Sequence, residues 1–315
     1  MDVLILAGGL SHERDVSIRS GRRVKDALES RGIRAKVADV DTSLIPTLRE
    51  LSDDTVVWPL LHGAPGEDGS LQALLELVDV PFVGSRSREA RVAWVKPVAK
   101  AVIARGGVST PEYVTLPQAL FREAGADQVL AALLDQFPLP LVVKPALGGS
   151  ALGVSLVTEP DQLAQAMVQC FAYSDTAMFE RAIIGTEVGV SVVGTGDSAR
   201  VLPAVEVVCE GPYDYDARYN PGRVEYFTPA RLDEVGTATV EAAALAVHRK
   251  LGLVDLSRID MILDADGVAQ VIDVNIAPGM TETSLFPQSI EASTADRGVL
   301  YERICAGALD RYRSR

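Results

Sequence analysis

The segment from Leu256 to Met280 is the part of the sequence that most constrains the fold. Apolar and other residues alternate on both sides of the dipeptide Asp266-Gly267. The apolar series are Ile259, Met261 and Leu263, then Ile272, Val274 and Ile276; between them stand Arg258, Asp260 and Ile262, then Val271, Asp273 and Asn275. Period-two alternation predicts two strands, each with one apolar face. Asp-Gly is a strong signal for a two-residue turn, so we expect an antiparallel hairpin.

The predicted register of this hairpin brings two carboxylates together. If Asp266 and Gly267 form the turn, Asp260 lies opposite Asp273, and Arg258 lies opposite Asn275. Like charges directly opposite one another are unfavourable in a sheet, so the pair needs water or a bridging cation. Carboxylate and amide oxygens suit magnesium, which commonly shares its coordination with substrate phosphates. A solvated polar face is the alternative; we favour magnesium, with Arg258 placed to grip a phosphoryl group or an oxyanion.

A glycine-rich loop directly follows another predicted strand. The stretch from Lys144 to Ser155 reads KPALGGSALGVS and comes after the apolar run that begins at Leu139. A mobile hairpin turn is one interpretation; a phosphate cover, with backbone N–H groups and a lysine facing an anion, is the other. The lysine precedes the glycines, so the loop is not of the Walker type. With the hairpin on the opposite side, the loop would enclose the triphosphate of ATP.

The N-terminal third alternates short apolar runs with amphipathic stretches. The expected strands are Val3–Leu6, Ala35–Val40, Thr55–Leu61 and Pro81–Gly84, and the expected helices are Val16–Ser30 and Ser70–Val78. This order predicts a parallel sheet with helices on both faces, whose ligands lie beyond the carboxyl ends of the strands. Two loops there, Ala7–Ser17 and Leu61–Ser70, each contain a histidine, a glutamate and glycines. The first lacks the glycines of a dinucleotide fingerprint.

The remaining elements follow in a less regular order. We expect helices at Ser87–Arg105, Pro117–Gln136, Pro160–Phe171 and Arg231–Leu251, and strands at Tyr113–Leu116, Ala177–Arg181, Glu187–Val193 and Arg200–Val208. The polar segment Glu210–Phe227 has no clear period and predicts a long functional loop. His248 is interpreted as an ordinary surface or core histidine, and Lys100 as a solvated side chain.

Composition excludes several classes of protein. A chain of 315 residues with 48% hydrophobic and 23% charged residues is an ordinary globular protein, long enough for two or three domains. Its net charge of -13 argues against a nucleic-acid binder and against an anionic membrane surface. Three separated cysteines fit a reduced, cytoplasmic protein without disulfides or structural zinc. No leader segment is expected, because the first residues enter a strand at once. No membrane span is expected, because no apolar run is long enough to cross a bilayer.

Six segments together resemble the D-alanine–D-alanine ligases of the ATP-grasp superfamily. They are AGGLSHERDVS, LLHGAPGEDGSLQALLE, VVKPALGGSALGVS, YDYDARY, SRIDMILDADG and VNIAPGMTETSL. Their order and spacing match the family over nearly the whole chain. The resemblance implies an α/β fold of three-domain ATP-grasp architecture, in which an N-terminal parallel α/β domain (1–86) precedes two α+β subdomains (87–180 and 181–315) that clasp ATP. It also implies a homodimer.

The resemblance further implies roles for individual residues. The ATP-binding set would be Lys96, Lys144, Gly149, Ser150, Glu180, Ile183, Glu187 and Arg218, with the lysines on phosphates, Glu180 and Ile183 at adenine and Glu187 at the ribose. Asp260, Asp273 and Asn275 would hold two Mg²⁺ ions, for which Mn²⁺ is an alternative. Glu13, Ser150, Tyr219 and His62 would contact the first D-alanine, Ser284 and Leu285 the second, and Arg258 and the Gly279 N–H the oxyanion.

The implied activity is the ATP-dependent joining of two D-alanine molecules through a D-alanyl phosphate, which supplies peptidoglycan precursors. Four positions depart from the family pattern: Asp273 stands in place of glutamate, Arg218 in place of lysine, and Gly148 and Ala151 in place of more polar residues. Two alternatives therefore stay open. One is a ligase of the same fold that joins another amino or hydroxy acid, and the other is a nucleotide-binding paralogue without activity.

Overall fold

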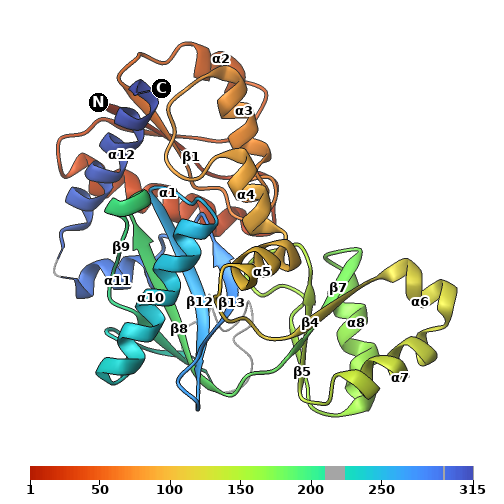
Figure 1. The fold of residues 1–315 in the computed structure, drawn as a ribbon. Coiled ribbons are helices and arrows are strands. Elements are labelled where there is room, and N and C mark those ends of the chain that lie inside the picture. The colour runs from red at the N-terminus through yellow and green to blue at the C-terminus, as the bar shows by residue number, and fades with distance from the viewer. Residues whose placement is uncertain (210–223, 294, 315) are drawn as a thin grey trace.

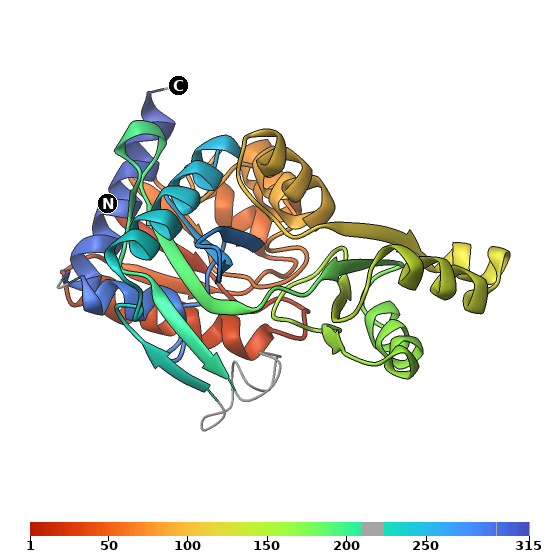
Figure 2. The same cartoon turned by 60° about the horizontal axis from the view of Figure 1, so that its bottom comes forward.

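The structure is a computed structural model that describes residues 1–209, 224–293 and 295–314. Three sheets organise this part of the chain. Figure 1 shows them in succession from the N-terminal region to a smaller lobe, which carries the helices α6 (Gln118–Ala124), α7 (Ala126–Gln136) and α8 (Leu163–Phe171). Figure 2 shows that this lobe extends away from the rest of the molecule. Within the described ranges, every helix is too short or too polar to cross a lipid bilayer.

The N-terminal sheet is parallel, as its strand–helix alternation predicts. Its strands are β1 (Asp2–Leu6), β2 (Ala35–Ala38) and β3 (Thr55–Pro59), in the order β2-β1-β3, and its helices are α1 (Arg14–Glu29), α2 (Leu44–Arg49) and α3 (Ser70–Val78). The predicted strand at Pro81–Gly84 is reduced to one parallel bridge, between Phe82 and Val57. The carboxyl ends of β1 and β3 lead directly into the two glycine-containing loops.

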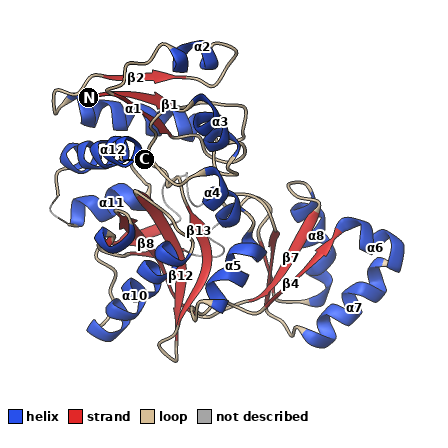
Figure 3. Cartoon of the chain, turned by 45° about the horizontal axis from the view of Figure 1, so that its top comes forward, coloured by secondary structure: helices blue, strands red, loops and turns tan. Residues whose placement is uncertain are grey.

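Helices cover both faces of this sheet. The last helix, α12 (Arg297–Arg313), returns to pack beside α1, so the end of the chain completes the N-terminal core (Figure 3). Trp58 of β3 meets the ring of Tyr301 edge-on at 5.2 Å between centroids. The opposite face is covered by α2 and α3, through residues such as Leu48 and Leu75. Burial on both faces explains why these strands are almost wholly apolar.

The middle sheet is antiparallel and forms the projecting lobe. Its strands are β4 (Tyr113–Pro117), β5 (Leu141–Pro145), β6 (Ser155–Val157) and β7 (Thr176–Arg181), in the order β4-β7-β5-β6. Its helices are α6 (Gln118–Ala124), α7 (Ala126–Gln136) and α8 (Leu163–Phe171), with the 3-10 turn η1 (Pro160–Gln162) before α8. Phe121, Phe171 and Phe179 pack together in the core between sheet and helices.

Two helices expected to be continuous are broken. The predicted helix from Ser87 to Arg105 is in fact α4 (Ser87–Trp94) and α5 (Lys96–Arg105). Pro97 has no N–H for the helical hydrogen bond and disfavours the helical conformation just before it. Val95 is extended and bridges Leu147 at the start of the glycine loop. The second break, between α6 and α7, lies at Gly125, whose φ is 86°.

The third sheet is antiparallel and carries the predicted hairpin. Its strands are β8 (Gly185–Val193), β9 (Arg200–Val201), β10 (Val205–Cys209), β11 (Val224–Phe227), β12 (Leu256–Asp264) and β13 (Ala269–Asn275), ordered β11-β10-β8-β12-β13 with β9 on β8. The 3-10 turn η2 (Gly196–Ser198) and the helices α10 (Glu234–Lys250) and α11 (Leu285–Ala292) complete this region. The strand expected over Arg200–Val208 is split, because Pro203 interrupts it.

The hairpin has the predicted register at Asp260 and Asp273, but its turn and the pairing near the turn differ from the prediction. Asp260 lies opposite Asp273, and Arg258 opposite Asn275, as predicted. Nearer the turn, however, Met261 pairs with Val271, so Ile272 is the extra residue of a β-bulge. The turn is correspondingly one residue longer than expected, which offsets the bulge.

The bulge also corrects the predicted faces of β13. Val271, not Ile272, is buried in the core beside Met261. Ile272 instead turns toward the cleft described below, together with Ile262. A one-residue change of register moves side chains to the other face of a sheet, and the bulge makes that change within a single strand.

Candidate active site

A cleft of about 350 Å³ lies between the middle sheet and the third sheet. Val142, Leu156, Ile262 and Ile272 provide apolar walls, and the predicted ATP-binding residues Lys96, Lys144, Gly149, Glu180, Ile183 and Glu187 line it with Asp273. The volume lies in the range of small-molecule sites, and an apolar cleft with a few charged groups is their usual composition. The structure therefore brings these six residues together at one site.

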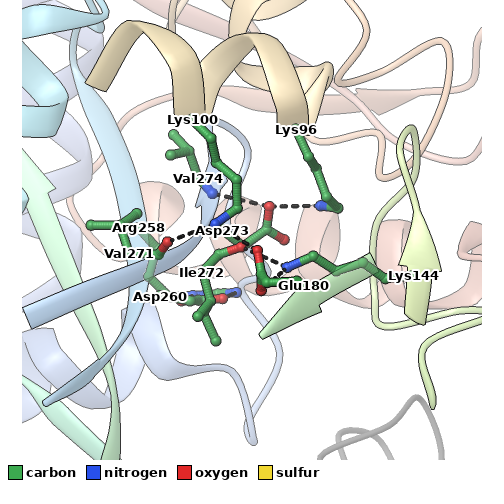
Figure 4. Close-up of polar contacts among 10 residues, drawn as sticks. All are labelled: Lys96, Lys100, Lys144, Glu180, Arg258, Asp260, Val271, Ile272, Asp273 and Val274. Carbon is green, nitrogen blue, oxygen red and sulfur yellow. Dashed lines mark hydrogen bonds and ion pairs between the residues drawn. The ribbon is translucent and has the colours of Figure 1, made fainter. Parts of the chain in front are cut away.

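Three buried charges form an ion cluster beside this cleft (Figure 4). Lys144 Nζ donates a hydrogen bond to Oε1 of Glu180, in β7, at 2.7 Å. Lys100 Nζ lies 2.6 Å from the other carboxylate oxygen, Glu180 Oε2. The second contact is an ion pair by distance, without the alignment of a hydrogen bond. Lys100 is only 3% exposed, so the prediction that it is solvated is wrong. Lys100 lies one turn after Lys96 on the same face of α5, which faces the interior, where Glu180 compensates its charge.

The two hairpin carboxylates are each paired with a different cation. Arg258 donates to both oxygens of Asp260, through Nε at 2.6 Å and Nη2 at 2.8 Å. Lys96 Nζ donates to Asp273 Oδ1 at 2.6 Å. Among the described residues, no cluster of three or more His, Cys, Asp and Glu side chains is arranged to hold a metal. In this structure each carboxylate thus has its own ion pair, an arrangement that the sequence did not suggest.

A second, polar cavity lies next to the cleft. It is lined by Glu13, His62, Glu67, Ser150, Arg258, Asn275, Gly279, Thr283, Ser284 and Leu285, which includes the predicted substrate-binding residues of the described chain. Glu13 begins α1 without capping it; its carboxylate instead accepts a hydrogen bond from the Ser150 hydroxyl. The N-terminal loop and the glycine loop therefore meet over this cavity.

The glycine loop and the segment near Gly279 have constrained backbones. Ser150 and Ala151 have φ values of 47° and 56°, in the left-handed region that glycine ordinarily occupies. At Gly279, a Cβ atom would lie 2.7 Å from Ser284 Oγ. Ser284 Oγ in turn accepts a hydrogen bond from the Thr281 N–H at 3.0 Å. Glycine at 279 is therefore required for its backbone to face the cavity so closely.

His62 lies in this cavity as a neutral imidazole. It is 4% exposed, and burial lowers its pKa to about 4, assisted by the positive charge of Arg258. Its Nε2 lies 3.4 Å from the Ser20 hydroxyl of α1. A neutral imidazole at neutral pH is available as a hydrogen-bonding group and not as a counter-ion.

Glu67 was not among the predicted site residues. Burial, followed by the nearby charge of Glu13, raises its pKa to about 8, and its Oε2 accepts a hydrogen bond from the Gly63 N–H at 3.0 Å. The sequence contained a signal, because the loop Leu61–Ser70 holds this glutamate among glycines. The sequence could not assign Glu67 a role in the site, because it did not show that Glu67 lies near Glu13 in the folded chain. Arg218 and Tyr219, by contrast, lie outside the described residues.

Comparison with known proteins decides the family. The family model described as D-ala D-ala ligase C-terminus matches residues 102–306, and the one described as D-ala D-ala ligase N-terminus matches residues 35–85. The chain belongs to the D-alanine–D-alanine ligase family. D-alanine–D-alanine ligases of Anaeromyxobacter sp. (strain Fw109-5) and Moorella thermoacetica are 38% and 34% identical to it, each over 98% of this chain and over 96% and 100% of their own lengths.

Solved structures of this family confirm the fold. The D-alanine–D-alanine ligase of Bacillus anthracis superposes with a TM-score of 0.84 at 27% identity, covering 100% of this chain and 99% of that one. VanG D-Ala:D-Ser ligase from Enterococcus faecalis gives a TM-score of 0.82 at 24% identity, over 98% and 99% of the two chains, and shows the likeness of fold alone. The expected three-domain ATP-grasp architecture is therefore confirmed, while its boundaries at 86/87 and 180/181 stay predictions.

Proposed function

We propose that this chain uses ATP to join two D-alanine molecules into D-alanyl-D-alanine, as the names of its relatives indicate. The observation that carries the proposal is the adjacency of two unlike cavities. The nucleotide-sized cleft and the polar cavity meet at the glycine loop, where a smaller cavity is lined by Gly149, Ser150, Asp273 and Asn275. A phosphoryl donor in the first would face a carboxylate in the second, which is the geometry that acyl phosphate formation needs.

The cleft residues suit the parts of ATP. Apolar walls with Ile183 would receive adenine beside Glu180, and Glu187 would accept hydrogen bonds from the ribose hydroxyls. Lys96 and Lys144 approach from α5 and β5 on two sides (Figure 4), so their ammonium groups would contact the phosphates. Arg218 is assigned to the same set by the resemblance.

Magnesium fits the donor set of the hairpin. Asp260, Asp273 and Asn275 offer hard oxygen atoms on neighbouring positions of β12 and β13, and such ligands suit Mg²⁺, or Mn²⁺, together with phosphate oxygens. The bound ions would neutralise phosphate charge during transfer. Because Lys96 and Arg258 hold the two carboxylates in this structure, metal binding would have to exchange these ion pairs for metal ligation.

The first half-reaction joins the carboxylate of one D-alanine to the γ-phosphoryl group of ATP, and ADP leaves. Glu13, 5% exposed and hydrogen-bonded by Ser150, would bind the ammonium of this D-alanine. The resemblance adds Tyr219 to the same contact, and neutral His62 lies beside it. Activation is necessary because hydroxide is a poor leaving group, whereas phosphate is a good one.

In the second half-reaction, the amine of the other D-alanine attacks the D-alanyl phosphate, and phosphate leaves with its electron pair. Arg258 and the Gly279 N–H would donate to the oxyanion that develops on the carbonyl oxygen. Such preorganised donors contribute much of the rate in acyl transfer. Ser284 and the adjacent Leu285 begin α11, and the helix N-terminus favours the carboxylate of the second D-alanine.

The test is a product assay with competing acceptors. The protein is incubated with ATP, Mg²⁺ and D-alanine, alone or with D-serine, D-lactate or L-alanine, while ADP release and product mass are followed. D-alanyl-D-alanine formed from D-alanine alone supports the proposal. ADP release that requires another acceptor would assign the chain to the other-acid ligase, and no turnover with intact ATP binding would assign it to the inactive paralogue.

Two further predictions of the resemblance need their own measurements. A homodimer should appear in sedimentation analysis as a species of twice the chain mass. A role in peptidoglycan synthesis should appear as rescue of a D-alanine–D-alanine ligase-deficient bacterium, which also requires the cytoplasmic location that the sequence predicts.

A further inference from the structure

Lys100 joins three separate segments beside the nucleotide cleft. Its Nζ forms the ion pair with Glu180, donates to the Thr110 hydroxyl, and donates to the Val271 carbonyl at 3.2 Å. The Tyr113 ring lies 5.5 Å from the same nitrogen. A buried lysine with several fixed partners loses most of its conformational freedom, so its ammonium group is held in place.

The two lysines on Glu180 also hold neighbouring points of β13. Lys144 Nζ donates to the Ile272 carbonyl at 3.2 Å, while Lys100 reaches the preceding carbonyl of Val271. These carbonyls belong to the bulge, where an edge strand leaves groups outside the regular ladder. Glu180 of the middle sheet is thereby connected to β13 of the third sheet through both lysines.

The cluster contains two positively charged lysines and one negatively charged glutamate, because Lys100 and Lys144 both pair with Glu180. Burial lowers the pKa of Lys100 to about 8, against the opposing attraction of Glu180, so the charged form still predominates at neutral pH. If Lys100 is removed, Glu180 keeps Lys144 as its cation in this cluster. Without Lys100, the buried carboxylate of Glu180 would have one cation in place of two, and it would attract the ammonium group of Lys144 more strongly.

We propose that Lys100 is a positioning residue for the nucleotide, which compensates Glu180 so that Lys144 remains directed at the phosphates. This rests on the proposed function only in that the cleft binds ATP. Lys100 acts through Glu180 and touches no reacting atom. Its place inside α5, one turn from Lys96, lets one helix supply both a phosphate-facing lysine and the support for another.

The experiment measures the Kd of the non-hydrolysable ATP analogue AMP-PNP, with Mg²⁺ and without D-alanine, by titration calorimetry. Lys100→Met should raise this Kd by roughly tenfold, because a partner of a buried charge is lost. Lys100→Arg, which keeps the charge, should recover most of the affinity. In a Glu180→Gln background, Lys100→Met should change Kd by less than about twofold, because the charge it compensates is absent.

Tyr113→Phe is the matched control, since it removes the hydrogen bond to the Pro97 carbonyl at 2.8 Å but keeps the ring beside Lys100. It should lower the melting temperature without changing Kd. An unchanged Kd in Lys100→Met, or equal effects of Lys100→Met in the wild-type and Glu180→Gln backgrounds, would overturn the proposal. Failure of the wild-type protein to bind AMP-PNP would instead remove the proposed function.

Discussion

Asp260 and Asp273 lie directly opposite one another on β12 and β13, and each carboxylate forms an ion pair with a different cation of the described chain. Arg258 holds the first, which is 6% exposed, and Lys96 holds the second. Like charges facing one another across a sheet are destabilising, and here each charge is compensated from outside the pair. Substrate and metal would therefore enter a site whose two carboxylates are each already paired with a cation.

Asp273→Asn tests the role of this hairpin in metal binding. Loss of a residue that only supports a metal ligand lowers activity by roughly 10- to 100-fold. Loss of a ligand should lower it by at least as much, and the remaining activity should require more Mg²⁺. ADP release across a magnesium titration measures both effects. The stabilisation of the AMP-PNP complex by Mg²⁺, followed by its melting temperature, should decrease in parallel.

The same substitution should hardly change the stability of the protein without metal. Two effects oppose one another, because the facing charge is removed but the ion pair with the partly exposed Asp273 is lost as well. Ion pairs of this kind contribute about 1 kcal/mol or less. Wild-type turnover with wild-type magnesium dependence in Asp273→Asn would exclude the hairpin as the metal site.

Lys144→Met tests the lysine ahead of the glycine loop. The variant should bind AMP-PNP roughly tenfold or more weakly, because it loses a cation that faces the phosphates, and it should leave Glu180 with Lys100. Lys25→Met is the matched control: Lys25 is a surface lysine of α1 paired with Glu29, and its loss should change neither Kd nor turnover. Equal Kd values for the two variants would remove Lys144 from the site.

Glu67→Gln tests whether a proton resides in the polar cavity. The folded-state pKa of Glu67 is raised to about 8 from 4.5, so between these values the folded chain keeps a proton that the unfolded chain has released. Stability attributable to this group therefore falls as pH rises from about 4.5 to 8. In Glu67→Gln the melting temperature of the ligand-free protein should decline less over that range; an identical decline would show that Glu67 is ionised when folded.

His248 should contribute to acid denaturation. It is buried between the Ser257 hydroxyl at 2.8 Å and the Gly194 carbonyl at 3.2 Å, and burial lowers its pKa to about 4 from 6.5. Between these values the unfolded chain binds the proton, so stability falls as pH drops through this window, by up to about 3 kcal/mol.

The measurement compares His248→Asn with His12→Asn, a substitution of an exposed histidine. Urea unfolding at pH 6.5 and pH 4.5 should show a smaller acid loss for His248→Asn than for the wild type, and an unchanged loss for His12→Asn. If both variants lose as much stability as the wild type, His248 is already protonated in the folded protein.

The local sequence pattern was sufficient to predict an element where the periodicity of that segment alone specifies its secondary structure. Alternation along β12 and β13 predicted the hairpin, and strand–helix alternation predicted the parallel N-terminal sheet. The pairing of Asp260 with Asp273 was also predicted, although a longer turn and a bulge had to offset one another to produce it. Pro97 and Pro203 are visible in the sequence as interruptions, but the longer apolar periods around them predict unbroken elements.

Periodicity, turn residues and motif spacing are local properties, and they were enough to predict the parallel N-terminal sheet, the hairpin, the family and the candidate residues. The pairing of charges, by contrast, depends on the packing of distant segments. Lys100 is buried and not solvated because β7 places Glu180 against it, and the pKa of Glu67 is raised because folding buries it and brings it near Glu13. Desolvation and Coulomb interactions depend on distances between residues far apart in the chain, and no local pattern contains those distances.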